Sequence, residues 1–160
     1  MRVHLADAGE AVAAGELTAA VYVGGGFIPA EDAYVHKLLD GSGRAADAEL
    51  WVVTDQARML GCVTFCPEGS SWRELARPGE AEFRMLAVSP DARGRGVGEA
   101  LVSRCIERAR ELGFGSMVLS TMEPMTSAHR LYGRLGFQRV PEQDWSPINE
   151  VCLWAYRMDL

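Results

Sequence analysis

Apolar residues along this chain of 160 residues alternate between stretches with helical spacing and short runs typical of strands. The clearest helical stretch covers residues 97–112, where apolar positions recur every fourth residue on one face. It follows a strand-like run at residues 82–88 and a turn at 89–91. We therefore expect a strand, a turn and a long helix in succession in the middle of the chain.

The rest of the pattern predicts further helices and strands in mixed order. We expect helices at residues 8–22, 30–39 and 124–135, and strands at 2–6, 50–54, 59–65, 117–120 and 150–158, with a short strand starting at Phe137. Asp7 is suited to cap the first helix, and the glycines at 41–43 to end the second. Because no linker or repeat interrupts this order, we expect a single α/β domain over residues 1–160.

Composition narrows the class of protein. Hydrophobic residues make up 48% of the chain and charged residues 24%, as in ordinary globular domains. The net charge of −6 argues against a general nucleic-acid or anionic-membrane surface. We expect no nucleic-acid and no membrane partner.

The cysteines and histidines give no sign of a metal site or a disulfide framework. The four cysteines form no close Cys-x-x-Cys pair, and the three histidines are far apart in sequence. No apolar run approaches the roughly 20 residues that span a bilayer, and the N-terminus lacks an apolar signal core. We expect a cytoplasmic protein without a bound metal.

A glycine-rich loop, Arg93–Gly98, joins the predicted strand to the long helix. Free N–H groups at a helix start bind anions, and glycines let the backbone approach closely, so the loop is suited to a diphosphate. A dinucleotide fingerprint does not fit, because its third glycine falls at Glu99 and no acid follows near position 120. A Walker loop fails for lack of a following Gly-Lys-Ser/Thr. A plain chain-reversing turn remains the alternative.

Two segments carry a resemblance to a known family. Arg93–Gly98 matches the pattern Arg-x-x-Gly-x-Gly, and Ala128–Phe137 matches Ala-x-x-Leu-Tyr-x-x-Leu-Gly-Phe. Both patterns, in this order, resemble the signatures of the GCN5-related N-acetyltransferase (GNAT) superfamily, over roughly residues 80–140. The resemblance implies a mixed, mostly antiparallel sheet flanked by helices and splayed at its central strands, and acetyl-CoA as co-substrate.

The resemblance also implies which residues hold the cofactor. They are Leu86, Ala87, Val88, Arg93, Gly94, Arg95, Gly96, Val97, Gly98, Ala128 and Tyr132. Pairing of the pantetheine arm with residues 86–88 requires an open strand edge, so we expect a β-bulge near Met85 or Leu86. At one position the chain departs from the family pattern, because Met125 stands where an asparagine is frequent.

Two residues are candidates for proton transfer. By resemblance, Tyr132 protonates the departing thiolate, and a phenol suits that task if its hydroxyl reaches the sulfur; simple packing is the alternative. Glu82 is the best candidate for the base that deprotonates the amine through water, with an ion pair to Arg84 as its alternative role. Glu80 is a weaker candidate base, and we expect His129 at the surface.

The acceptor is less well defined. Candidate walls of its site are aromatic, namely Tyr22, Phe27, Tyr34, Trp72 and Trp145. We predict acetyl transfer to a primary amine of a small molecule or peptide. The alternative is a non-catalytic acyl-CoA-binding or regulatory module, which needs neither Tyr132 nor Glu82. An exposed last strand offers an edge for a homodimer.

Overall fold

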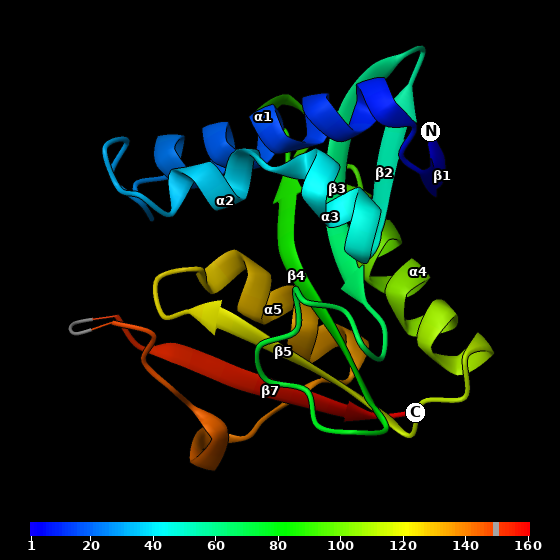
Figure 1. Cartoon of the computed structure of the whole chain (residues 1–160), viewed down its shortest axis with the longest axis vertical. Coiled ribbons are helices and arrows are strands. Elements are labelled where there is room, and N and C mark those ends of the chain that lie inside the picture. The colour runs from blue at the N-terminus through cyan, green and yellow to red at the C-terminus, as the bar shows by residue number, and fades with distance from the viewer. Residues whose placement is uncertain (149–150) are drawn as a thin grey trace.

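A computed structural model describes residues 1–148 and 151–160, and within them the strands form one seven-stranded sheet (Figure 1). The strands are β1 (Arg2–Leu5), β2 (Glu49–Asp55), β3 (Arg58–Cys66), β4 (Glu80–Val88), β5 (Ser116–Met122), β6 (Gln138–Arg139) and β7 (Leu153–Asp159). The helices are α1 (Ala8–Gly24), α2 (Val35–Leu39), α3 (Gly41–Asp47), α4 (Val97–Glu111) and α5 (Thr126–Leu135). The order of strands in the sheet is β1-β2-β3-β4-β5-β7-β6.

The central strands β4 and β5 part from each other, as the resemblance implies. They pair in parallel only where residues 80–82 face residues 116–118, whereas the described neighbours elsewhere in the sheet pair antiparallel. Beyond Glu82, β4 continues to Val88 and β5 to Met122 without pairing with each other, and the two ribbons diverge in Figure 1. The predicted mixed and splayed sheet is therefore confirmed, and one edge of β4 is left open.

A β-bulge interrupts β4 just before this open edge. Cys62 faces Ala87 and Thr64 faces Arg84, so two steps along β3 match three along β4. Met85 has a φ of +56°, a left-handed conformation that costs a non-glycine residue of order 1 kcal/mol or more. The expected bulge near Met85 or Leu86 is confirmed.

Helices cover both faces of the sheet. Neighbouring residues of β3 point to opposite sides, so that Val63 packs in the core beneath α4 while Cys62 packs beneath α1. The larger core also takes in Phe65 and Phe83, whereas α2 and α3 lie against α1 on the other side (Figure 1). This arrangement gives three layers, with the open edge of β4 in the middle one.

The first helix starts where the sequence predicts. Asp7 Oδ1 accepts the N–H of Glu10 at 2.8 Å, and Glu10 Oε1 accepts the N–H of Asp7 at 3.1 Å, which makes a capping box. The predicted second helix at 30–39 is wrong in its first half, because α2 begins only at Val35. The predicted end at about Leu39 is right, but the segment 41–43 belongs to a further helix: Asp40 Oδ1 accepts the N–H of Gly43 at 2.9 Å and so caps α3.

Helix α1 meets the junction of α2 and α3 with no side chain between the backbones. A Cβ added at Gly15 would overlap the carbonyl oxygen of Leu39, and one added at Gly41 would overlap that of Ala11. We call this contact the Gly15–Gly41 seam. It holds α2, and the residues before it, against the C-terminal half of α1.

The last strand is not the open edge that the sequence suggested. β7 pairs with β5 along its length, and on its other side β6 faces Tyr156 and Arg157 while Trp145 forms a bridge with Leu153. The edges of the described sheet are β1 and β6 instead. Glu150, the predicted start of this strand, lies outside the described residues. The homodimer stays a prediction.

None of the helices in the described parts of the chain combines the length and the apolar character needed to cross a bilayer.

Candidate active site

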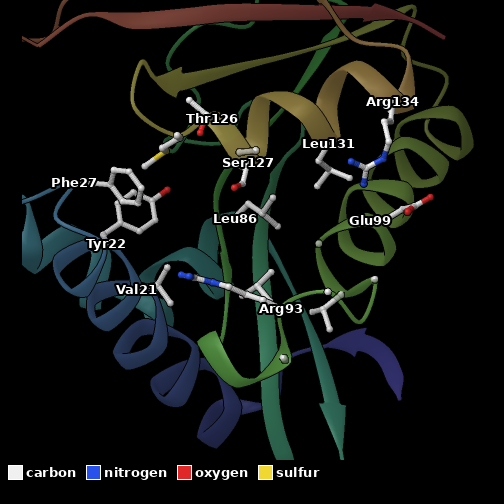
Figure 2. Close-up of a pocket in the computed structure, with 18 of the residues that line it drawn as sticks. Val21, Tyr22, Phe27, Leu86, Arg93, Glu99, Thr126, Ser127, Leu131 and Arg134 are labelled. Atoms are coloured by element: carbon white, nitrogen blue, oxygen red, sulfur yellow. The ribbon is translucent and has the colours of Figure 1, made fainter.

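A cavity of about 870 Å³ opens where β4 and β5 part (Figure 2). Its walls come from the end of α1, the second half of β4, the glycine-rich loop with the start of α4, and one face of α5 along its length. The lining residues are Val21, Tyr22, Phe27, Leu86, Val88, Ala92, Arg93, Gly94, Gly96, Val97, Gly98, Glu99, Pro124, Met125, Thr126, Ser127, Ala128, Leu131 and Arg134. Most of the predicted cofactor residues thus line one cavity.

The glycine-rich loop forms one end of the cavity. Gly94 and Gly96 have φ values of +77° and +78°, and Gly96 is the N-cap of α4. A glycine cap has no side-chain acceptor, so the N–H groups of the first turn of α4 are left for a ligand. Arg95, which was predicted to bind the cofactor, points elsewhere and pairs with Asp55 at 3.2 Å.

Leu86 and Val88 bring the open edge of β4 to the cavity, and Ala128 faces them from α5. The Ala87 side chain, also predicted at the cofactor, packs on the other face of the sheet against Ala11 and Ala14. Only the backbone of Ala87 is therefore open to a role at the cofactor.

Tyr132 is 5% exposed and does not line the cavity. Its ring makes edge contacts with Phe83, Phe137 and Tyr156 at centroid distances of 5.8–6.0 Å. Its hydroxyl has no hydrogen-bond partner among the described residues, and burial raises the pKa of Tyr132 above its usual range. The phenol therefore stays protonated at neutral pH.

Glu82 is fully buried and also lies outside the cavity lining. Its Oε1 accepts the backbone N–H groups of Glu74, Leu75 and Ala76 at 2.9–3.0 Å. Its Oε2 is buried without a partner among the described residues. Glu82 thus fixes the loop at residues 67–79 and keeps one oxygen free. The weaker candidate Glu80 bonds to Arg157 and to Ser116.

Aromatic residues form the end of the cavity away from the glycine-rich loop. Tyr22 and Phe27 lie there side by side, and the Tyr22 hydroxyl points into the cavity (Figure 2). Tyr34 and Trp72 pack behind Tyr22 in a cluster with Met85. The fifth predicted wall residue, Trp145, lies elsewhere, since its indole N–H donates to Ser120 Oγ at 2.9 Å.

Two features at α5 concern residues discussed from the sequence. Met125 lines the cavity, where its sulfur accepts the Thr121 hydroxyl at 3.8 Å. His129 faces away from the cavity and stacks on Trp154 at a centroid distance of 5.2 Å. Burial lowers the pKa of His129, so its neutral form is favoured.

The sequence analysis missed Arg134, which lines the cavity opposite Glu99 (Figure 2). Its guanidinium has no ion-pair partner among the described residues. A usable signal was present, because Ser127, Leu131 and Arg134 share one helical face. Leu131 belongs to the matched motif, and extending its face by four residues back and three forward would have predicted Ser127 and Arg134.

Comparison with known proteins defines the class to which this fold and this cavity belong. The model of the acetyltransferase (GNAT) family matches residues 19–137, which is well over half of the chain. The chain belongs to this family, whose members use acetyl-CoA.

Curated relatives bear related names. An uncharacterized N-acetyltransferase of Schizosaccharomyces pombe is 37% identical over 99 residues, which cover 62% of this chain and 56% of that protein. The N-acetylaspartate synthetase of Danio rerio is 34% identical over 94 residues, which cover 59% of this chain and 31% of that protein. The chain thus spans about a third to just over half of the length of these relatives.

Solved structures share the fold over nearly the whole chain. An acetyltransferase of the GNAT family from Staphylococcus aureus Mu50 has a TM-score of 0.79 at 14% identity, covering 99% of this chain and 98% of its own. The structure of yncA from Salmonella typhimurium, which holds acetyl-CoA, has a TM-score of 0.72 at 22% identity, covering 100% of this chain and 94% of its own. At these identities the likeness establishes the fold alone.

Proposed function

We propose that this protein is an acetyl-CoA-dependent N-acetyltransferase that transfers the acetyl group to a primary amine by direct attack. The observation that carries this proposal is the single cavity that joins the glycine-rich loop to the open edge of β4. Acetyl-CoA has a diphosphate, which suits the glycine-rich loop, and an extended arm, which suits the open edge of β4.

The residues present fit this co-substrate. The N–H groups at the start of α4, together with Arg93, are suited to the pyrophosphate. Beyond Glu82, the edge of β4 that faces β5 lacks a partner strand, so an extended arm can pair with it as a strand does. Ala87 contributes only main-chain atoms, because its side chain faces α1.

In the proposed reaction the acceptor nitrogen bonds to the acetyl carbon while the carbon–sulfur bond breaks. A proton of the amine passes through water to Glu82, whose Oε2 has no partner among the described residues. Tyr132 gives its proton to the departing sulfur, and its raised pKa means that the phenol still holds this proton at neutral pH. Both groups return to their starting state by exchange with solvent.

The first test measures binding of acetyl-CoA and of CoA by calorimetry in the wild type and in a Gly96→Glu variant. A glutamate at the helix start repels the pyrophosphate, so we expect binding to be lost. The control is Gly113→Glu at the other end of α4. Gly113 has nearly the same φ, +81°, and equally open surroundings, but it does not line the cavity. The control variant therefore has the same backbone strain and should bind acetyl-CoA and CoA normally.

Three outcomes are informative. Binding lost only in Gly96→Glu supports the site and justifies a screen of amines. Binding without turnover on any amine favours the non-catalytic acyl-CoA-binding module. A well-folded wild type that binds neither compound contradicts both readings.

A further inference from the structure

An ion pair stands behind the aromatic end of the cavity. The Arg84 guanidinium contacts Glu74 Oε1 at 2.7 Å, donates to the Tyr34 hydroxyl at 2.9 Å and donates to the carbonyl oxygen of Trp72 at 2.9 Å. The side chains of Arg84 and Glu74 are 10% and 31% exposed. We call these two residues the Arg84–Glu74 pair, and no step of the proposed reaction uses it.

The pair lies behind the Tyr22 wall of the cavity, although neither Arg84 nor Glu74 is itself part of the lining. Arg84 immediately precedes Met85, the residue of the bulge, and Met85 packs with Tyr22, Tyr34 and Trp72. Tyr22 in turn lines the cavity, and its hydroxyl lies within electrostatic range of Arg84. The opposite side of β4 is taken by Leu86 and Val88, which face α5 and the glycine-rich loop.

Stability alone is a poor explanation for such a pair. Removing two charges from water costs several kcal/mol per ion, and apolar replacements are often as stable. Glu74 is also the more exposed member, on a loop whose backbone Glu82 holds in place. Burial raises the pKa of Glu74, whereas the neighbouring Arg84 charge lowers it, so the carboxylate depends on a cation beside it.

We propose that the acceptor is a zwitterionic α-amino acid, whose carboxylate binds Arg84 and whose ammonium group binds Glu74. The inference rests on the proposed function and names its substrate class. An α-amino acid carries its two charges on groups attached to the same carbon, so they lie close together like the charges of the pair. Because each charge exchanges one partner for another, none is left buried and unpaired.

Replacing Glu74 by a substrate carboxylate is also compatible with the other contacts of Arg84. Arg84 keeps its hydrogen bonds to Tyr34 and Trp72 while its contact with Glu74 is replaced, so its guanidinium group stays oriented toward a planar carboxylate. The bound ammonium group then lies beside the loop held by Glu82, the residue proposed above as the base.

The proposal predicts a sharp preference among acceptors. An amino acid amide or a simple alkylamine retains the amine but offers Arg84 no carboxylate, and a site built for a polar group rejects analogues that lack it by up to about 10⁴–10⁵-fold. The N-terminus of a peptide fails for the same reason, because an amide replaces the carboxylate.

The experiment measures kcat/KM by mass spectrometry of acetylated products for free L-amino acids, the matching amino acid amides, an N-terminal peptide and ethylamine. We expect at least one amino acid to exceed its own amide by about 100-fold. Equal rates for amides, peptide or ethylamine overturn this inference and leave the proposed function standing. If no amino acid is acetylated the inference is also wrong, and calorimetry with acetyl-CoA then judges the proposed function separately.

Two variants separate recognition from folding. Arg84→Met should raise KM for the preferred amino acid by about tenfold or more and change KM for ethylamine far less, because ethylamine has no carboxylate. Glu74→Gln should raise KM for both acceptors, because both bring an ammonium group, and acetyl-CoA affinity should be kept in both variants. The control is Glu68→Gln, which breaks the Arg73–Glu68 pair of 3.0 Å on the same loop. A merely structural role of Arg84 predicts equal losses with amino acids and with ethylamine in Arg84→Met, and that result contradicts the proposal.

Discussion

Glu82 Oε1 accepts the backbone N–H of Glu74 at 3.0 Å, so a buried carboxylate at the start of β4 holds the loop residue that pairs with Arg84. The same oxygen accepts two more N–H groups, from Leu75 and Ala76. One carboxylate thus links the interior of the sheet to the loop at residues 67–79. This link exists whether or not Glu82 also accepts a proton from the amine.

Glu82→Gln should reduce the free energy of unfolding by about 1–3 kcal/mol, because hydrogen bonds to a charged acceptor become bonds to a neutral one. Urea unfolding measures this change. Glu68→Gln, at a pair whose carboxylate is 56% exposed, should cost less than about 0.5 kcal/mol. If Glu82 is in addition the base, kcat of the folded Glu82→Gln variant falls while the affinity for acetyl-CoA is kept. An unchanged kcat removes the base role but not the structural one.

Tyr132→Phe should lower kcat by about 10²-fold or more if the phenol protonates the thiolate. Stability should hardly change, because the hydroxyl has no hydrogen-bond partner among the described residues and the ring contacts with Phe83 and Phe137 remain. Steady-state kinetics and calorimetry with acetyl-CoA separate the two effects. Turnover at the wild-type rate would mean that Tyr132 only packs.

Arg134→Gln should weaken CoA binding by about 3–10-fold, since an exposed cation next to a bound anion is worth roughly 1 kcal/mol. The effect should be larger at about 50 mM than at about 300 mM salt, because salt screens exposed charges. Arg130→Gln is the control, one helical turn earlier on α5 and outside the cavity lining. Equal losses in the two variants point to general surface charge rather than to a specific contact.

Stability should fall as the solution becomes alkaline. Burial raises the pKa of the Cys66 thiol to about 12, whereas an unfolded cysteine titrates near about 8.5. Between these values the unfolded chain releases a proton that the folded protein keeps, so the contribution is complete below about pH 8.5 and is lost as the pH rises toward 12. The slope approaches about 1.4 kcal/mol per pH unit for this thiol.

Urea unfolding at about pH 8 and about pH 10 measures that slope. We expect it to be shallower in Cys66→Ala, while Cys152→Ala should leave it unchanged because Cys152 is exposed. Identical slopes in the wild type and Cys66→Ala would show that the Cys66 thiol does not cause the loss of stability at alkaline pH.

The sequence predicted those parts of the site that depend on local chemistry. The glycine-rich loop and the long helix follow from residue types and spacing, whereas the bulge at Met85 was expected from the family resemblance, which requires an open strand edge there. The start of α3 was missed because Asp40 caps the helix at glycines that otherwise look like a stop.

The acceptor side could not be predicted in the same way. The loop at residues 67–79 has no periodicity, so its contacts with Glu82 and Arg84 depend on the folded sheet. The outward turn of Arg95 and the burial of Ala87 likewise depend on neighbours, Asp55 and α1, that are distant in sequence. Spacing within the motif says nothing about them.

The Gly15–Gly41 seam sets a limit on how this protein can acquire new acceptors. Since the two backbones already touch, no substitution can bring α2 closer to α1, and the space near Tyr34 cannot shrink by helix movement. Any added side chain at the seam can only force the helices apart. A smaller acceptor site therefore requires bulkier side chains around Tyr22. A larger site can arise in two ways, by smaller side chains around Tyr22 or by a side chain at the seam that moves α2 away from α1.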